Sequence, residues 1–339
     1  MNIALVGCGG MAKVYRRRYT EIEGARLAVL VDISEETVKT AAEELSVTRY
    51  GTDFNLALAS DIDIVDISTP NQFHAAQAIA ALAAGKHVII QKPLTPTVRE
   101  GEAICAAAKQ YGKQAGMYMG LREEAVFDDL KIMTDTGKLG RVASIRSRMA
   151  HRGGLTAKPQ GWRASLEKTG GGSFIQLAVH HVNIIQYILS ARIVRVFAFS
   201  NNVMCPNIGG DDITMCVCEF DNGVQGVLES SYCSDGNSFE IYGSQGYVQL
   251  PPDNNIMLKL DSDFSGQVLQ YSTPGKIARI KGPGRQKDGP NPLDQHVAFV
   301  TAMMQGKPAP VSAEMGLYDL RVVDAVYRSA NMGALAEVV

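Results

Sequence analysis

Apolar and polar positions follow one pattern in the first third of the chain and a different one afterwards. In the first third, short runs rich in β-branched residues alternate with stretches of helical spacing. The apolar runs predict strands at residues 3–7, 27–32, 62–67, 88–91 and 114–118. The stretches between and after them predict helices at residues 11–19, 35–45, 72–84, 98–111 and 124–136. This alternation is typical of an α/β domain with a doubly wound parallel sheet, in which the carboxyl ends of the strands share one edge.

From residue 142 onward, longer segments alternate apolar and polar residues, as in an antiparallel sheet with one covered face. These segments predict strands at residues 142–150, 194–201, 214–220, 224–232, 239–242 and 247–250, and helices at residues 172–189, 293–304 and 314–331. Residues 272–292, rich in Gly, Pro, Lys and Arg, are predicted to form an exposed loop or an oligomer arm. We therefore expect two domains: residues 1–121 with the parallel sheet, and residues 122–339 with an α+β fold and a large, mostly antiparallel open sheet.

Composition limits the partners of the protein. The chain has 339 residues, and its net charge of -2 provides no overall field that would attract nucleic acid or an anionic membrane. No apolar run reaches the roughly 20 residues of a membrane span, and the N-terminus lacks the pattern of a secretory signal. The six cysteines are scattered without a CxxC pair, so we expect buried, reduced thiols and no metal site. We expect a cytoplasmic protein that binds a small molecule, and neither nucleic acid nor membrane.

The first predicted strand runs into a glycine-rich turn, GCGGMA, that opens a helix. Glycines in such a turn let the pyrophosphate of a dinucleotide approach the backbone, and the helix start supplies N–H donors. Asp32 ends the second strand, where a carboxylate can bind the adenosine ribose hydroxyls and repel a 2′-phosphate. Because Glu35 and Glu36 follow without a nearby arginine, NAD is favoured over NADP. The turn residues expected to contact NAD are Gly7, Gly9, Gly10, Met11 and Ala12.

A single lysine follows the fourth predicted strand. The run HVIIQ is apolar and β-branched up to Gln91, and Lys92 and Pro93 come next. Ligands of open α/β sheets bind at the carboxyl ends of the strands. The pattern therefore places the Lys92 amine at the edge of the sheet where a ligand would lie.

The long predicted helix at residues 172–189 carries a stripe of polar residues. Gln176, His180, Asn183 and Tyr187 are spaced by four, three and four residues, which places them on one face of an α-helix. A buried polar stripe needs hydrogen-bond partners, and a ligand-filled cleft would supply them. His180 is therefore the candidate acid or base. His181 lies in the neighbouring apolar stripe and is expected to pack.

Several segments resemble one known enzyme family. They are GCGGMA, DIDIVDISTPNQFHAAQAIAALAAGKHVIIQKPL, GWR, GGGSFIQLAVHHVN and FEIYGSQGYVQL, and together they extend over nearly the whole chain. They look like the glucose–fructose oxidoreductase / inositol dehydrogenase / MocA-like family. The resemblance implies a Rossmann domain joined to an antiparallel α+β domain. It also implies NAD(P)-linked oxidation of a sugar or cyclitol hydroxyl, or the reverse reduction.

The resemblance also implies roles for individual residues. Lys92 matches the lysine of the family's EKP motif, which hydrogen-bonds the reacting oxygen and contacts the nicotinamide ribose, often beside a cis peptide. His180 matches the histidine of the family's DxGxH pattern. A helix-capping or packing role for His74 stays as open as ligand contact. Residues implied to lie near the cofactor are Ser68, Thr69, Pro70, Asn71, His74, Gln91 and Lys92. Residues expected near the substrate are Arg122, Arg152, Trp162, Arg163, Gln176 and Asn183.

Three positions depart from the family pattern. Gln91 stands where the family usually has Glu, Gln176 where it often has Asp, and Asn183 where Asp is common. Each change keeps hydrogen bonding and removes a negative charge, and Gln176 cannot relay a proton. Residues 141–168 meanwhile hold seven Lys or Arg residues and a single acid. Together these features motivate the hypothesis of an anionic substrate, with a solvated basic sheet edge as the alternative.

The predicted reaction is direct hydride transfer between a substrate carbon and nicotinamide C4. Lys92 and His180 would hold the substrate hydroxyl and one of them would take its proton, with Gln176 as a third member of the catalytic group. Two other functions stay open. One is a glycoside-cleaving lyase or hydrolase that oxidises a sugar carbon only transiently, and the other is a non-enzymatic, NAD-sensing regulator. By resemblance we also expect a homodimer or homotetramer formed by pairing of the second-domain sheets.

Overall fold

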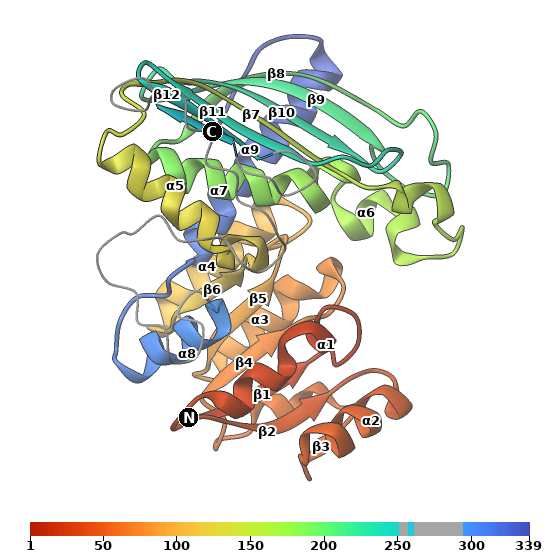
Figure 1. Cartoon of the computed structure of the whole chain (residues 1–339). Coiled ribbons are helices and arrows are strands. Elements are labelled where there is room, and N and C mark those ends of the chain that lie inside the picture. The colour runs from red at the N-terminus through yellow and green to blue at the C-terminus, as the bar shows by residue number, and fades with distance from the viewer. Residues whose placement is uncertain (251–256, 261–293) are drawn as a thin grey trace. The chain divides into compact units, whose positions relative to one another are not determined.

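The computed structural model describes residues 1–250, 257–260 and 294–339 (Figure 1). The described residues divide into two compact units. Unit 1 contains residues 1–123 and 294–318, and unit 2 contains residues 124–250, 257–260 and 319–339. The predicted loop or oligomer arm at residues 272–292 lies outside the described residues.

Unit 1 is built on a parallel sheet with the strand order β3-β2-β1-β4-β5-β6. The strand order reverses between β1 and β4, and ligands of doubly wound sheets bind at such a switch point. The strands are β1 (Asn2–Val6), β2 (Arg26–Val31), β3 (Tyr50–Gly51), β4 (Ile64–Ile67), β5 (His87–Gln91) and β6 (Ala115–Tyr118). The helices are α1 (Ala12–Tyr15), α2 (Glu35–Leu45), α3 (His74–Ala83), α4 (Val98–Tyr111) and α8 (Gln295–Met304). Short 3-10 turns are η1 (Arg16–Glu21), η2 (Phe54–Leu58), η3 (Asn71–Phe73) and η4 (Gly120–Glu123).

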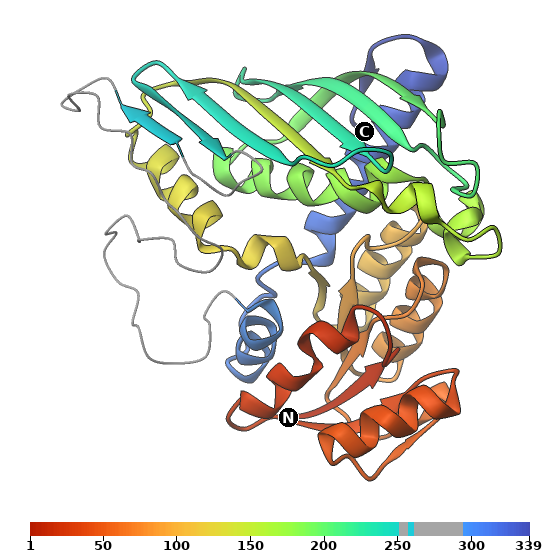
Figure 2. The ribbon, with the colours of Figure 1, turned by 45° about the vertical axis from the view of Figure 1, so that its right-hand side comes forward.

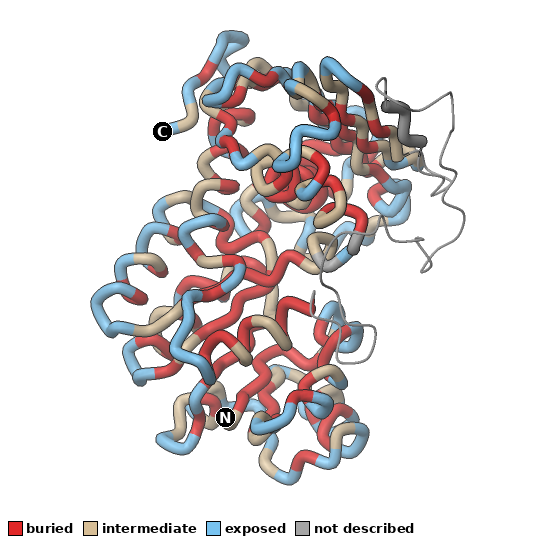
Figure 3. Tube along the Cα trace, turned by 60° about the vertical axis from the view of Figure 1, so that its left-hand side comes forward, coloured by how far each residue is buried: buried red, intermediate tan, exposed pale blue. Residues whose placement is uncertain are grey.

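The central strands of unit 1 are buried along almost their whole length (Figure 3). All four residues of β4 and of β6 are buried, as are the last four of β5. This burial explains why these strands are continuous apolar runs, since helices cover both faces of a doubly wound parallel sheet.

The segment that contains α8 packs into the core of unit 1. A β-carbon on Gly116 of β6 would lie 2.7 Å from the Phe299 ring, so glycine lets α8 approach the sheet closely. The His296 ring stacks on the Tyr15 ring with 3.7 Å between centroids. The sequence prediction kept residues 294–318 with the second domain, whereas these contacts group them with unit 1.

Unit 2 is built on a sheet with the strand order β13-β12-β11-β7-β10-β9-β8-β14. β7 and β10 pair in parallel, and all the other pairs are antiparallel. The strands are β7 (Val142–Ala150), β8 (Ile193–Asn201), β9 (Ile213–Phe220), β10 (Gln225–Ser231), β11 (Ser238–Gly243), β12 (Gly246–Leu250), β13 (Met257–Leu260) and β14 (Ala336–Glu337). The helical segments are α5 (Ala125–Asp135), η5 (Arg152–Thr156), η6 (Trp162–Ala164), α6 (Leu166–Thr169), η7 (Phe174–Ala178) and α7 (Val179–Leu189). The last helix, α9 (Ala313–Met332), belongs to unit 2 from residue 319 onward.

The sheet of unit 2 has one covered and one open face. Helix α7 lies along the covered face (Figure 2). In β9 the residues alternate, with Thr214, Cys216 and Cys218 buried while Met215 and Val217 are about half exposed. The predicted fold class, a Rossmann domain followed by an α+β domain with a large, mostly antiparallel open sheet, is confirmed.

Two predicted helices differ in kind from the observed ones. The helix expected at residues 11–19 is a single α-helical turn, α1, that continues as the 3-10 segment η1. The helix expected at residues 172–189 begins with a π-helical segment, η7, before α7. Among the described residues, no helix combines the length and the apolar character that a membrane span requires.

Candidate active site

The glycine turn of unit 1 is tight on its inner side and open on its outer side. Gly7 has a φ of 89°, and a β-carbon there would lie 2.6 Å from the Ser68 carbonyl oxygen, so only glycine fits. A β-carbon on Gly10 would meet no atom within 4 Å, and one on Gly9 would meet only Thr37 Cγ2, at 4.0 Å. This open space at the start of α1 fits the close approach of a pyrophosphate. Met11 beside it is 45% exposed, whereas Ala12 is buried.

Two charged side chains, Asp32 and Arg16, hydrogen-bond the backbone of the glycine turn. Asp32 accepts hydrogen bonds from the Cys8 amide (2.8 Å) and from the Ser34 amide (2.9 Å), one on each carboxylate oxygen. Each oxygen keeps a second lone pair, so the ribose contact predicted for Asp32 is compatible with these bonds. Arg16 is buried and donates to the Cys8 carbonyl oxygen (2.7 Å). Burial, with a smaller contribution from Asp32, raises the pKa of the Cys8 thiol to about 12, so this cysteine is a neutral packing residue.

His74 joins the loop after β4 to the turn after β5. Its buried ring places Nε2 2.8 Å from the Thr69 carbonyl oxygen and Nδ1 3.1 Å from that of Pro93. Burial lowers the pKa of His74, so the ring is neutral and donates one N–H to these carbonyls. These are the contacts of a packing residue, and contact of His74 with the cofactor stays a prediction.

The other residues of this loop lie close to the glycine turn. The Ser68 hydroxyl forms a short contact with the Tyr15 hydroxyl, and Thr69 Oγ1 donates to Gln77 Oε1 (2.7 Å). Pro70 precedes η3, in which Asn71 is buried. The Ser68 carbonyl leaves no room for a β-carbon on Gly7. The loop after β4 therefore lies directly against the glycine turn, at the point where the strand order of the sheet reverses.

β5 ends at Gln91, as predicted, and Lys92 follows directly after it. The Lys92–Pro93 peptide is cis, as the resemblance implied. Gln91 is buried, and its Oε1 accepts the Lys92 amide (2.9 Å). Within the described part of the chain, Gln91 Nε2 has no hydrogen-bond partner. A buried amide nitrogen of this kind is normally satisfied by a partner, so the strand end is a place where a ligand acceptor would bind. Lys92 itself is half-buried, as is the predicted substrate contact Arg122 in η4.

In unit 2, Gln176 and His180 lie on consecutive helical segments. Gln176 is buried within the π-helical segment η7, and His180 is in the first turn of α7. His180 is the single half-buried residue in an otherwise buried run from 171 to 185. A π segment carries an extra residue per turn and occurs often at functional sites. The spacing predicted for an ideal α-helix therefore does not hold between Gln176 and His180.

The rest of the predicted polar stripe is engaged within unit 2. Asn183 donates to Asp319 on α9 (2.7 Å), and Tyr187 donates to Asp128 on α5 (2.8 Å). His181 is buried, its ring lies edge-on to Phe239 at 5.5 Å, and burial lowers its pKa to about 4. His181 packs, as expected. A substrate contact for Asn183 stays a prediction, and its observed partner gives it a structural role.

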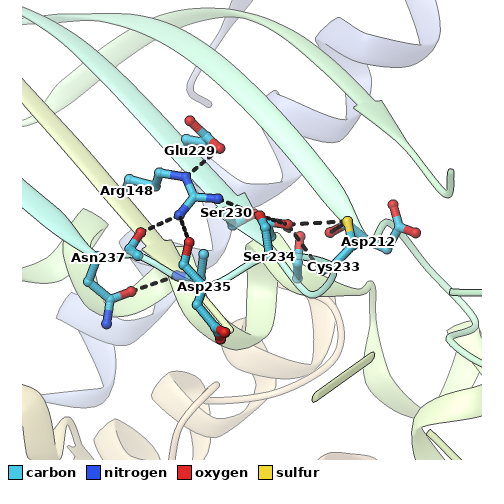
Figure 4. A network of polar contacts seen from close by, with 12 residues as sticks. Arg148, Asp212, Glu229, Ser230, Cys233, Ser234, Asp235 and Asn237 are labelled. Carbon is cyan, nitrogen blue, oxygen red and sulfur yellow. Dashed lines mark hydrogen bonds and ion pairs between the residues drawn. The ribbon is translucent and has the colours of Figure 1, made fainter. Parts of the chain in front are cut away.

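The basic segment contains arginines that are already paired with acids. Arg148 donates to Glu229 (2.7 Å) and to the Asp235 carbonyl oxygen, and it anchors the turn between β10 and β11 (Figure 4). Arg152 forms an ion pair with the Asp235 carboxylate (2.6 Å). Arg163 is exposed and stacks on the half-buried Trp162 ring, with its guanidinium 4.6 Å from the centroid. Arg163 also hydrogen-bonds the Tyr232 side chain, so all three arginines have partners within unit 2.

Two buried carboxylates were not singled out by the sequence analysis. Asp66 in β4 accepts hydrogen bonds from the Tyr15 and Tyr19 hydroxyls (3.2 and 2.8 Å). Asp211, just before β9, binds the residues that open η7. The sequence signal for the second was GGDD, a glycine pair and two carboxylates directly before a β-branched run.

Comparison with known proteins matches the two units in chain order. The model described as "Oxidoreductase family, NAD-binding Rossmann fold" matches residues 1–119, and the "GFO/IDH/MocA C-terminal domain" matches residues 127–249. The chain belongs to the GFO/IDH/MocA oxidoreductase family.

Members of the GFO/IDH/MocA family named for sugars and cyclitols are similar to this chain. The 1,5-anhydro-D-fructose reductase of Ensifer adhaerens is 24% identical, with 98% of this chain and 97% of the relative covered. The scyllo-inositol 2-dehydrogenase (NAD(+)) of Bacillus subtilis is 27% identical, with 73% of each covered. The solved structure of the aldose-aldose oxidoreductase from Caulobacter crescentus, complexed with glycerol, is 26% identical with a TM-score of 0.85, and 99% of each chain is covered. The chain is thus an oxidoreductase of a family that acts on CH–OH groups through an NAD-binding Rossmann domain.

Proposed function

We propose that this protein is an NAD-dependent oxidoreductase that transfers a hydride between nicotinamide and a hydroxyl or ketone of a sugar, a sugar derivative or a cyclitol. The observation that carries the proposal is the open glycine turn at the strand-order switch, with Asp32 at the end of β2. The same turn would accept NADP, but the carboxylate of Asp32 disfavours a 2′-phosphate. When the substrate is oxidised, the nicotinamide of NAD would accept the hydride.

The chain's own residues divide the remaining work. Gly9 and Gly10 would hold the pyrophosphate, Asp32 the adenosine ribose, and Lys92 the nicotinamide side. The ammonium group of Lys92 would donate a hydrogen bond to the substrate oxygen, and His180 would accept the proton of the substrate hydroxyl. In the alternative assignment, Lys92 accepts that proton and His180 donates the hydrogen bond. Gln176 would orient the substrate by hydrogen bonds only, since an amide cannot carry a proton away.

An anionic substrate remains a finer proposal about the same site. The amides Gln91, Gln176 and Asn183 reduce the negative charge that other family patterns carry at these positions. Arg163 is exposed and could meet a carboxylate or phosphate, which an arginine binds in a bidentate manner. Arg148 and Arg152 add less support, because each already has a carboxylate partner.

We also propose that the protein is a homo-oligomer formed through the open face of the unit 2 sheet. That face exposes Phe199, Met215, Val217 and Val227, with 67%, 51%, 52% and 43% of their surfaces accessible. Neighbouring strands carry these residues side by side, because Phe199 pairs with Met215 and Val217 with Val227. A contiguous apolar patch of this kind marks an interaction surface. Light scattering on the purified protein would measure the number of subunits.

The test of the activity is a panel of polyols, cyclitols, uronates, sugar phosphates and nucleotide sugars with NAD and with NADP. Formation of NADH from at least one substrate class is expected, with NAD preferred. A clear preference for neutral sugars would remove the anionic-substrate proposal alone. Release of an aglycone without net NADH would instead indicate a glycoside-cleaving enzyme, and no turnover with any class would contradict the proposed function.

Lys92→Ala should lower kcat about 1,000-fold, because it removes a group that holds the reacting oxygen. NAD affinity, measured by calorimetry, should fall far less than kcat, because the contacts proposed for the pyrophosphate and the adenosine ribose remain. The matched control is Lys109→Ala, which removes an exposed lysine from α4 of the same unit. Turnover of Lys92→Ala equal to that of the control would refute the assigned role.

A further inference from the structure

The helical segment that carries Gln176 and His180 starts on a single buried carboxylate. Asp211 Oδ1 accepts hydrogen bonds from the Gly172 amide (2.9 Å) and the Tyr327 hydroxyl (2.7 Å). Its Oδ2 accepts the Phe174 amide (2.9 Å), and Ser173 Oγ (2.7 Å) and Thr214 Oγ1 (2.8 Å) add two more bonds to the same oxygen. Five donors therefore converge on one side chain that is only 7% exposed.

The four backbone amides that open the helix are all satisfied from outside it. Those of Gly172 and Phe174 bind the Asp211 carboxylate, and that of Ser173 binds the Asp211 carbonyl oxygen (2.7 Å). The Ile175 amide binds the Tyr327 hydroxyl (3.3 Å). Gln176 is the first residue whose amide bonds within the segment, to the Gly172 carbonyl oxygen (3.2 Å). A helix start leaves four amides without internal partners, and here one aspartate with one tyrosine takes all of them.

Glycines bring the two backbones together at this point. A β-carbon on Gly172 would collide with the backbone of Asp211, and one on Gly210 would collide with the backbones of Gly171 and Gly172. The carboxylate also suits its position, because negative charge is stabilised at the N-terminal end of a helix. The helix start is consequently filled by the protein's own acid rather than left open for an anionic ligand.

The segment held in this way is the π-helical one. A π turn can relax to an α turn, which has one residue fewer, and the side chains on it then rotate around the helix axis. Such a change would move Gln176 relative to His180. Contacts that fix the first four amides oppose it, because they set both the axial position and the rotation of the segment.

We propose that Asp211 is a positioning residue for catalysis: by holding the amides of residues 172–174 it fixes the π-helical segment and so sets the orientation of Gln176 and His180. This inference rests on the proposed function, since those two residues are assigned there. Asp211 touches neither substrate nor cofactor in this proposal and acts through the helix alone.

The adjacent residue provides a matched control. Asp212 is fully buried and also accepts three backbone amides, from Val203 (2.9 Å), Met204 (2.6 Å) and Cys205 (2.7 Å). Those amides belong to the loop between β8 and β9, not to the helix. Asp211→Asn and Asp212→Asn thus remove the same charge at the same depth, one from the helix start and one from the loop.

The experiment compares both variants with the unchanged protein by steady-state kinetics, NAD calorimetry and hydrogen exchange. Asp211→Asn should lower kcat about 100-fold, the effect of displacing a catalytic group by a small distance. It should also shift the pH profile of kcat/KM, leave NAD affinity unchanged and speed exchange of the amides at residues 172–175. Asp212→Asn should leave kcat, the pH profile and those amides close to the unchanged protein. Equal losses of kcat in the two variants would show a merely structural role and overturn the proposal.

If Asp211→Asn does not fold, Tyr327→Phe decides the question, because it removes a single oxygen that binds both Asp211 and the Ile175 amide. A roughly tenfold lower kcat supports the proposal, and an unchanged kcat with unchanged exchange refutes it. The exchange readout needs no turnover. If the unchanged protein reduces no NAD on any substrate, the proposed function fails, and exchange at residues 172–175 still tells whether Asp211 fixes the segment.

Discussion

The turn after β1 and the segment before η7 both lead glycines into a helix, yet the two helix starts are used differently. At the first, β-carbons added to Gly9 and Gly10 would meet almost no protein atom. At the second, a β-carbon on Gly172 would collide with the backbone of Asp211, and that residue binds the first helix amides. A glycine run before a helix therefore indicates a ligand cradle only where no internal acid already occupies the helix start.

The carboxylates near the two helix starts differ as well. Asp211 receives five donors, two of them backbone amides. Asp66, buried in β4, receives two hydroxyl donors from the described residues, Tyr15 and Tyr19, and no backbone amide among them. Burial raises the pKa of Asp66 to about 7, and the two tyrosines oppose that rise. Asp211 thus binds the amides that open a helix, whereas Asp66 is a buried acid with two hydroxyl donors and a raised pKa.

The sharpest test of the closed helix start is Gly172→Ala. Its β-carbon would meet backbone atoms, which cannot rotate away, so the free energy of unfolding should fall by at least about 4 kcal/mol. Urea denaturation followed by circular dichroism measures this loss.

The control for that variant is Gly223→Ala in the turn between β9 and β10. Gly223 has a φ of 83°, but a β-carbon there would meet no atom within 4 Å. It should cost only about 1 kcal/mol, from backbone strain alone. Similar losses of unfolding free energy in the two variants would mean that the backbone around Asp211 can move to admit the β-carbon. The helix start would then not be closed.

Local signals account for the parts of the fold that the sequence predicted best. α2 and α4 have the predicted bounds because Ser34 and Thr97 cap their first turns, accepting the amides of Thr37 and Glu100. β7 also has its predicted bounds, since alternation marks a half-buried strand directly. The same holds for the glycine turn, whose residues are contiguous in the chain.

The features that sequence reasoning missed depend on partners far away in the chain. The π segment η7 is held by Asp211, and the amide of Asn183 is bound to Asp319. The placement of α8 in unit 1 depends on Phe299 meeting Gly116. The spacing of residues within a single helix does not reveal these contacts. The polar stripe of α7 could therefore be predicted from the sequence, but the hydrogen-bond partners of its residues could not.

The second test concerns the carboxylate of Asp66. Its pKa in the folded protein is about 7, against roughly 3.9 in an unfolded chain. The stability that its protonated form contributes is complete below pH 4 and is lost as the pH rises through 7. Asp66→Asn has no such titration. The free energy of unfolding of the variant, relative to the unchanged protein, should therefore rise by about 4 kcal/mol between pH 4 and pH 8.

Other charged groups around Asp66 stay the same in that comparison. His296 Nε2 lies 3.7 Å from the carboxylate, and burial keeps the pKa of His296 well below its usual range. Asp294, near the other His296 nitrogen, is paired with Arg18 (2.9 Å). Tyr19→Phe is the control, because it keeps the acid, removes a donor that lowers its pKa, and should extend the loss to higher pH. Parallel pH profiles for Asp66→Asn and the unchanged protein would contradict the assigned titration.

The mildest change tests the open helix start. Gly9 does not adopt a left-handed φ, and its added β-carbon would meet only Thr37 Cγ2 at 4.0 Å, so Gly9→Ala should fold with an unchanged unfolding midpoint. If a pyrophosphate packs against this glycine, the methyl group should weaken NAD about tenfold, a difference of about 1.4 kcal/mol. Calorimetry with NAD, ADP-ribose and adenosine locates the effect, because only the first two carry a pyrophosphate and only they should lose affinity. Equal NAD affinity in Gly9→Ala and the unchanged protein would place the pyrophosphate elsewhere. The open space at the start of α1 would then not be a ligand site, just as the helix start that Asp211 fills is not one.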